Sequence, residues 1–74
     1  MCVICIKDKG AQLPSMKELQ AAYHHNPDGC GLVSSNGVYW KGLSFKEFCK
    51  QLQKVREEDS CIIHFRIGTH VNSI

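Results

Sequence analysis

Apolar residues along the chain follow two spacings, and the first of them predicts strands. The opening run, 1–7, is apolar and rich in β-branched residues, which is typical of a strand buried on both faces. Two further apolar runs, 31–34 and 38–41, flank Asn36-Gly37, a dipeptide that strongly favours a β-hairpin. The run 61–67 predicts the last strand, and the acidic stretch just before it predicts a solvated turn.

The second spacing is helical and predicts two helices. Ser15 and Glu18 form a capping-box pattern in front of an apolar face, so we expect a helix that ends near His25. A second helix is predicted to begin at Ser44, and its apolar face repeats at Phe45, Phe48, Cys49, Leu52 and Val55. The order β-α-β-β-α-β predicts an α+β fold in which two helices cover one face of an antiparallel sheet. A ferredoxin-like fold has the same element order and is the alternative.

Length and charge limit what such a chain does. Its 74 residues hold one domain with a limited core, so we treat 1–74 as a single unit. Nine basic and seven acidic residues give a formal net charge of +2, which provides no electrostatic argument for binding nucleic acid. The longest apolar run is far short of the ~18 residues that a membrane span needs. We therefore expect neither nucleic acid nor a membrane as partner.

The five cysteines all fall in segments predicted as strand or helix. A disulfide framework usually has an even number of cysteines in a loop-rich chain, so we expect reduced thiols and a cytoplasmic protein. Cys2 and Cys5 form a C-x-x-C pair, and Cys61 and His64 form a C-x-x-H pair. Zinc knuckles place a turn between such ligands, whereas both pairs lie within predicted strands. We expect no bound metal and no other cofactor.

Three short motifs lie at the first strand, before the second strand and at the last strand. They are Met1-Cys2-Val3-Ile4, Asn26-Pro27-Asp28-Gly29-Cys30-Gly31-Leu32 and His64-Phe65-Arg66-Ile67-Gly68-Thr69-His70. In this order they resemble class II glutamine amidotransferases of the Ntn-hydrolase type and their small phage-encoded relatives. The third motif is the most specific, and together the motifs span nearly the whole chain. The resemblance implies the amino-terminal part of such a domain, with a sheet that forms half of an Ntn-type sandwich.

The resemblance also implies roles for individual residues. Once Met1 is removed, Cys2 would attack the side-chain amide of glutamine and form a thioester, with its own α-amine as the base. Arg66 would hold the substrate carboxylate, with Thr69 and His70 nearby. The remaining substrate-binding or interface candidates are Asp28, Ile62 and His64.

Other features of the sequence argue against an active enzyme. Val71 stands where the family has glycine, and the chain ends at Ile74, before the family's asparagine-glycine oxyanion segment. If Met1 is retained, the amine of Cys2 lies in a peptide bond and the base is missing. Because positioning and oxyanion stabilisation supply much of the rate, we expect no glutaminase activity from the isolated chain. The alternative is an amide hydrolase that another chain or another copy completes.

One face of the sheet is predicted to remain uncovered. It would present Ile62, His64 and Arg66, together with either Val3 and Cys5 or Cys2, Ile4 and Ile6. Because exposed apolar patches usually mark association sites, we expect an interface in a homodimer or with a protein partner. The predicted function is a non-catalytic binding or inhibitor protein. Phage-encoded inhibitors of host defence complexes, including CRISPR inhibitors, have a similar size and also lack cofactor signals.

Overall fold

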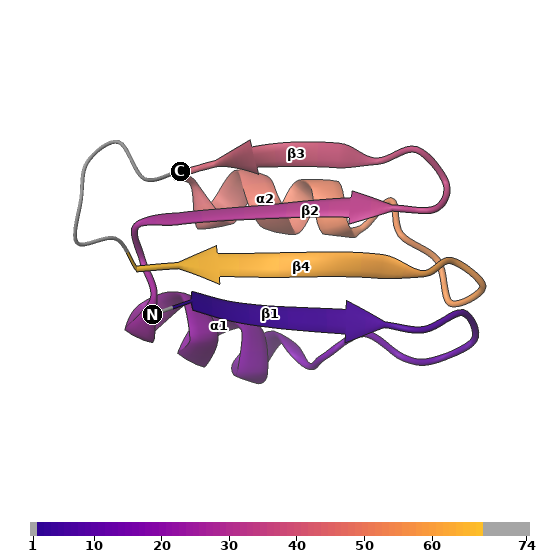
Figure 1. Cartoon of the computed structure of the whole chain (residues 1–74), viewed down its shortest axis with the longest axis horizontal. Coiled ribbons are helices and arrows are strands. Elements are labelled where there is room, and N and C mark those ends of the chain that lie inside the picture. The colour runs from indigo at the N-terminus through magenta and orange to yellow at the C-terminus, as the bar shows by residue number, and fades with distance from the viewer. Residues whose placement is uncertain (1, 68–74) are drawn as a thin grey trace.

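The computed structural model describes residues 2–67, without the side chain of Cys2, and contains the six predicted elements in the predicted order (Figure 1). They are β1 (Cys2–Lys7), α1 (Met16–His25), β2 (Gly29–Ser34), β3 (Tyr39–Gly42), α2 (Phe45–Leu52) and β4 (Cys61–Arg66). The strand boundaries differ from the prediction by one or two residues, and α2 ends one turn before Val55. The turn at Asn36-Gly37 is also present, and Gly37 has a φ of 96°, which favours glycine.

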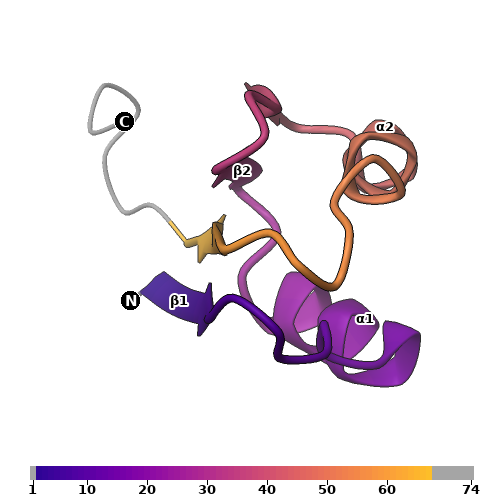
Figure 2. The same ribbon diagram turned by 90° about the vertical axis from the view of Figure 1, so that its right-hand side faces the viewer.

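The four strands form one antiparallel sheet in the order β1-β4-β2-β3 (Figure 1). The last strand of the chain therefore lies between the first and the second. A ferredoxin-like sheet instead has its first and third strands at the centre, so that alternative is wrong for this chain. Both helices lie on one side of the sheet and leave its other side open (Figure 2). The two-layer α+β architecture is confirmed.

Each helix begins at a serine cap. The hydroxyl of Ser15 accepts a hydrogen bond from the amide of Glu18 at 3.2 Å, and the Glu18 carboxylate accepts one from the Ser15 amide at 2.9 Å. This is the predicted capping box. The hydroxyl of Ser44 likewise accepts from the amide of Glu47 at 3.1 Å, but the Glu47 carboxylate accepts from Gln51 instead. Caps of this kind stabilise a helix by ~1 kcal/mol each, which matters in a domain this small.

The core lies between the sheet and the two helices. Phe48 of α2 and both Ile63 and Phe65 of β4 are fully buried, and the rings of Phe48 and Phe65 meet edge to face with centroids 5.2 Å apart. The remaining buried apolar residues are Leu19, Cys30, Leu32, Leu52, Val55 and Cys61. Alternate residues of β4 thus supply the centre of the core, as the period of two in a strand requires.

The expectation that the first strand is buried on both faces is wrong. Ile4 is 64% exposed and Ile6 is 68% exposed, whereas Cys5 is partly buried and Lys7 is buried. β1 is an edge strand with helices on one side only. A continuous apolar run fits two buried faces or one buried and one exposed apolar face, and the sequence cannot tell these apart. The structure also decides between the two alternatives for the open side: Ile4 and Ile6 lie there.

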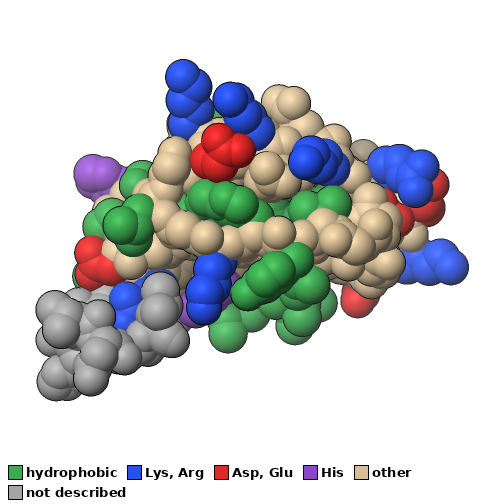
Figure 3. All heavy atoms as spheres, turned by 90° about the horizontal axis from the view of Figure 1, so that it is seen from above, with side chains coloured by type: hydrophobic (Ala, Val, Ile, Leu, Met, Phe, Trp, Pro, Cys, Tyr) green, Lys and Arg blue, Asp and Glu red, His purple; other side chains and the backbone are tan. Residues whose placement is uncertain are grey.

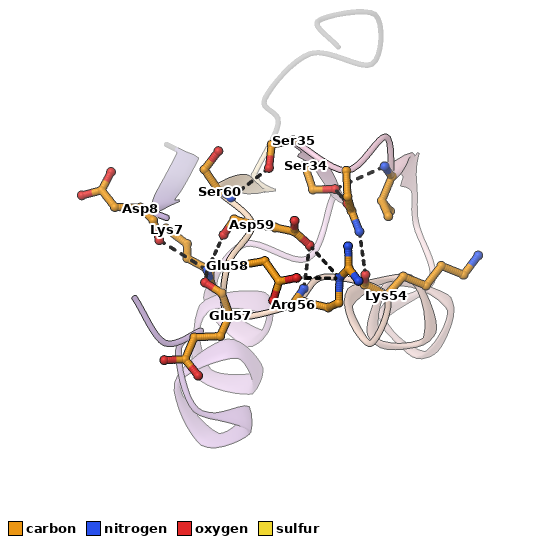
Figure 4. Close-up of polar contacts among 12 residues, drawn as sticks. Lys7, Asp8, Ser34, Ser35, Lys54, Arg56, Glu57, Glu58, Asp59 and Ser60 are labelled. Carbon is orange, nitrogen blue, oxygen red and sulfur yellow. Dashed lines mark hydrogen bonds and ion pairs between the residues drawn. The ribbon is translucent and has the colours of Figure 1, made fainter. Parts of the chain in front are cut away.

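The segment before β4 is not the fully solvated turn that its acidic residues predict. Asp59 is buried, and its carboxylate accepts a hydrogen bond from the amide of Arg56 at 2.9 Å. The segment is organised around Lys7, whose side chain is only 3% exposed (Figure 4). Its ammonium donates to the carbonyl oxygens of Asp8 at 3.3 Å, Glu57 at 2.8 Å and Asp59. Three carbonyls use all three donors of the ammonium, which allows a lysine to be buried.

Candidate functional site

The surface of the sheet that faces away from the helices is built from alternate residues of all four strands. We call it the open face. The side chains that define it belong to Ile4, Ile6, Val33, Tyr39, Lys41, Ile62, His64 and Arg66, with Gly31 between them. Ile62, His64 and Arg66 were predicted on this face from the alternation of the last strand.

An apolar row crosses the open face from edge to edge. The strand register aligns Ile6 of β1, Ile62 of β4, Val33 of β2 and Tyr39 of β3. These side chains are 68%, 45%, 46% and 70% exposed, in that order. Figure 3 shows apolar side chains projecting together from the side of the molecule opposite the helices. A large apolar group in water is unfavourable, and a contiguous set of them typically marks a site of association.

A second row lies beside the first and contains a hollow. The register aligns Ile4, His64, Gly31 and Lys41 across the four strands. Gly31 has no side chain, and above it lies a hollow of about 170 Å³ between Val33, Tyr39, Lys41, Ile62 and His64. A Cβ atom at Gly31 would lie 2.9 Å from the carbonyl oxygen of Trp40 and 3.0 Å from the Cβ atom of Lys41. Glycine is therefore required here for the close approach of β3.

A third row lies at the end of the sheet and brings together parts of all three motifs. The backbone of Arg66 pairs with Cys2 on one side and with Gly29 on the other. The carbonyl oxygen of Arg66 also accepts a hydrogen bond from the amide of Asp28 at 2.8 Å. Arg66 is only 9% exposed, so it offers less surface to a partner than Ile62 does. Asp28 is exposed.

Some of the predicted site positions cannot be compared with the structure. Thr69 and His70 lie outside the described residues, as do Met1 and Val71. The side chain of Cys2 also lies outside what is described. The roles that the resemblance implies for these residues stay predictions.

The cysteines of the described region are placed for packing. Cys61 faces the core, whereas His64 lies on the open face, so this pair cannot bind one metal ion. No group of three or more His, Cys, Asp or Glu side chains within the described residues is arranged to hold a metal ion. Burial raises the pKa of the Cys30 thiol to about 11, with a further contribution from Cys49, and burial also raises the pKa of Cys49 and of Cys61. These thiols are protonated at neutral pH and are therefore weak nucleophiles.

Sequence reasoning did not identify the hollow or the buried lysine. A glycine inside a strand often marks close backbone approach, so Gly31 carried a usable signal. Alternation also places Lys41 on the same side as Tyr39, but the neighbours of both depend on strand order. Nothing in the sequence around Lys7 indicated that it is buried, because the carbonyl oxygens that it contacts, at Glu57 and Asp59, lie about fifty residues away along the chain.

No helix in the described part of the chain is long and apolar enough to cross a bilayer. No family model, no curated protein and no solved structure matches this chain.

Proposed function

We propose that this chain is a non-catalytic binding protein whose open face docks onto a protein partner. The observation that carries the proposal is the apolar row formed by Ile6, Ile62, Val33 and Tyr39, one residue from each strand. Alternation along β4 would allow polar residues on the side away from the core, as is common in antiparallel sheets. Here the row that crosses all four strands on that side is apolar instead, and water is the only environment that the described residues provide for it.

The energetics fit a docking surface. Burying a large apolar side chain completely contributes ~1.5–3 kcal/mol, and the four members of the row are each about half exposed or more. Covering the row would therefore contribute several kcal/mol to association. A standard interface buries ~800 Å² on each partner, which is the scale of one face of a small sheet.

The surface is also rigid, which lowers the cost of binding. Its side chains stand on strands that are hydrogen-bonded on one or both sides, and β4 and β2 are held between neighbours. Ile and Val have few rotamers to lose, and Tyr has only two side-chain torsions. Little conformational entropy has to be removed when a partner covers them. A host protein complex is the target class to test first, by analogy of size with phage-encoded inhibitors.

The proposal is tested by a charge placed at the centre of the row, with a matched control. Ile62→Glu puts a carboxylate on the open face, and Met16→Glu does the same on α1 at a residue of similar exposure, 48% against 45%. Proteins retained from the native host by the wild type are identified, purified and titrated against the wild type and both variants. We expect Met16→Glu to bind like the wild type and Ile62→Glu to lose binding. Equal affinity of a folded Ile62→Glu variant would refute the proposal.

A second candidate function rests on the third row. There the backbones of Cys2, Arg66 and Gly29 lie side by side, and Asp28 is bonded to Arg66, so residues of all three motifs meet at one end of the sheet. This favours an amide hydrolase with Cys2 as nucleophile, completed by another chain. Intact-mass measurement shows whether Met1 is removed. Ammonia release from glutamine that disappears in Cys2→Ala would establish the activity, and complete retention of Met1 would exclude it.

A further inference from the structure

We propose that the hollow above Gly31 is the anchoring site of the open face, and that it receives an apolar side chain of the partner that stands next to a carboxylate. The proposal rests on the function proposed above and adds the chemistry of the partner. It follows from two properties of the hollow, its shape and the basic side chains beside it.

The shape suits a single inserted side chain. Gly31 forms the floor, and because a Cβ atom there would collide with β3, the floor cannot be raised without moving that strand. Ile62, Val33 and Tyr39 of the apolar row line the hollow along one side, around a volume of about 170 Å³. Apolar pockets of this kind, small and set in a rigid surface, are where the anchor residues of interfaces insert. A partner side chain that fills the hollow would contact all three apolar residues at once.

The two polar side chains beside the hollow are basic. Lys41 and His64 lie on either side of Gly31 in the same row, one on β3 and one on β4. Neither side chain has a hydrogen bond or an ion pair with any other residue between 2 and 67. The strand positions that form the described open face include no aspartate or glutamate, and the third basic residue, Arg66, stands at the end of the same face. An apolar anchor with an adjacent carboxylate would fill the hollow and pair with Lys41.

The occupant is a different protein and not a second copy of this chain. A second open face would bring another Lys41 and no aspartate or glutamate, so it could not pair with the first Lys41. Charge complementarity across an interface fixes the orientation and excludes wrong partners, while the apolar contact supplies most of the affinity. The carboxylate therefore defines which partner surfaces fit.

The test uses two small probes that differ only in charge, 3-phenylpropionate and 3-phenylpropanamide. Each is titrated into isotope-labelled full-length protein, and binding is followed through the backbone amide resonances in nuclear magnetic resonance spectra. We expect both probes to shift the resonances of Gly31, Lys41 and His64. The carboxylate should bind about threefold more tightly than the amide, the effect of one partly exposed ion pair.

Three variants show which side chains contribute to the binding of each probe. Lys41→Gln should remove the preference for the carboxylate and leave the amide probe unaffected, whereas Ile62→Glu should remove binding of both. Lys46→Gln on α2 removes an exposed lysine far from the hollow and should change neither affinity. Equal affinity for the two probes, or resonance shifts confined to another part of the chain, would overturn the proposal.

Two further outcomes separate this inference from the proposed function. If Ile62→Glu abolishes binding of the protein partner but Lys41→Gln has no effect on it, the open face is a docking surface without the acidic anchor. If the wild type forms a dimer by light scattering, and Ile62→Glu dissociates that dimer while Lys41→Gln leaves it unchanged, the occupant is a second copy. Either result would refute the anchoring chemistry, and only the first would leave the proposed function intact.

Discussion

The two faces of the sheet are made by the same four strands, and apolar residues dominate both. On the covered face Ile63 is completely buried, and on the open face its neighbour Ile62 is 45% exposed. Two helices pack against the covered face through Leu19, Phe48 and Leu52. No element within the described residues packs against the open face. Residue type therefore says little about the role of a strand position here, and the side on which the helices lie decides it.

The largest expected effect contrasts the two isoleucines. Ile63→Ala removes fully buried methylene and methyl groups and leaves a cavity, so it should destabilise the protein by ~3 kcal/mol. Ile62→Ala removes the same atoms from a half-exposed site and should cost less than ~1 kcal/mol. Urea unfolding followed by circular dichroism measures both. Similar losses for the two variants would mean that the open face is covered in solution by the protein itself.

The second effect concerns the buried ammonium at the edge of the covered face. Lys7→Met keeps an unbranched side chain but removes the ammonium. It should cost ~2 kcal/mol because the buried carbonyl oxygen of Asp59 loses this donor, whereas those of Glu57 and Asp8 keep backbone amide donors. Lys9→Met changes an exposed lysine two residues away and should lie within ~0.5 kcal/mol of the wild type. The same unfolding measurement tests this pair. If Lys7→Met is as stable as Lys9→Met, water replaces the ammonium without penalty.

The third expected effect is a pH dependence of stability that comes from the covered face. The pKa of Cys30 on the covered face is raised by burial to about 11 from its usual 9.0. The unfolded chain therefore loses this proton at lower pH than the folded one. The stabilisation is complete below pH 9 and is lost as the pH rises from there towards 11, by at most ~1.4 kcal/mol per pH unit for one thiol. Cys30→Ala should show a shallower loss of stability over this range. Parallel stability curves for the two proteins would contradict the burial of this thiol.

The smallest expected effect lies on the open face. Ile6→Thr keeps the β-branched shape that suits a strand, and it should change stability by less than ~0.5 kcal/mol. The same change should reduce partner binding, because Ile6 belongs to the apolar row. Met16→Thr provides the control, since Met16 is also exposed, 48% against 68%, but lies on α1, on the other side of the sheet (Figure 2). Binding reduced to the same extent by both variants would show that general hydrophobicity, not this row, is what the partner recognises.

The sequence was sufficient for the elements and for the layers, but not for the site. The spacing of apolar residues and the serine caps were enough to locate both helices and all four strands, because these signals are local in the sequence. Which apolar residues are covered depends on strand order, so β1 was mistaken for a strand with two buried faces. The hollow above Gly31 needs β3 on one side and β4 on the other, and these strands are about twenty residues apart in sequence. The burial of Lys7 depends on carbonyl oxygens of a loop that lies about fifty residues away along the chain.

The position of β4 between β1 and β2 has a consequence for the newly made chain. Among the strands that the structure describes, β1 is made first, yet its neighbour in the sheet is β4, the last of them to be made. The β2–β3 hairpin can form as soon as residue 42 is available, whereas β1 has no partner strand until residues 61–66 have left the ribosome. Until then the apolar segment Val3 to Ile6 has no sheet to join and is accessible to other unfinished chains or to chaperones. The sheet is therefore complete only after its most distant segments have paired, and contacts between distant segments generally slow folding.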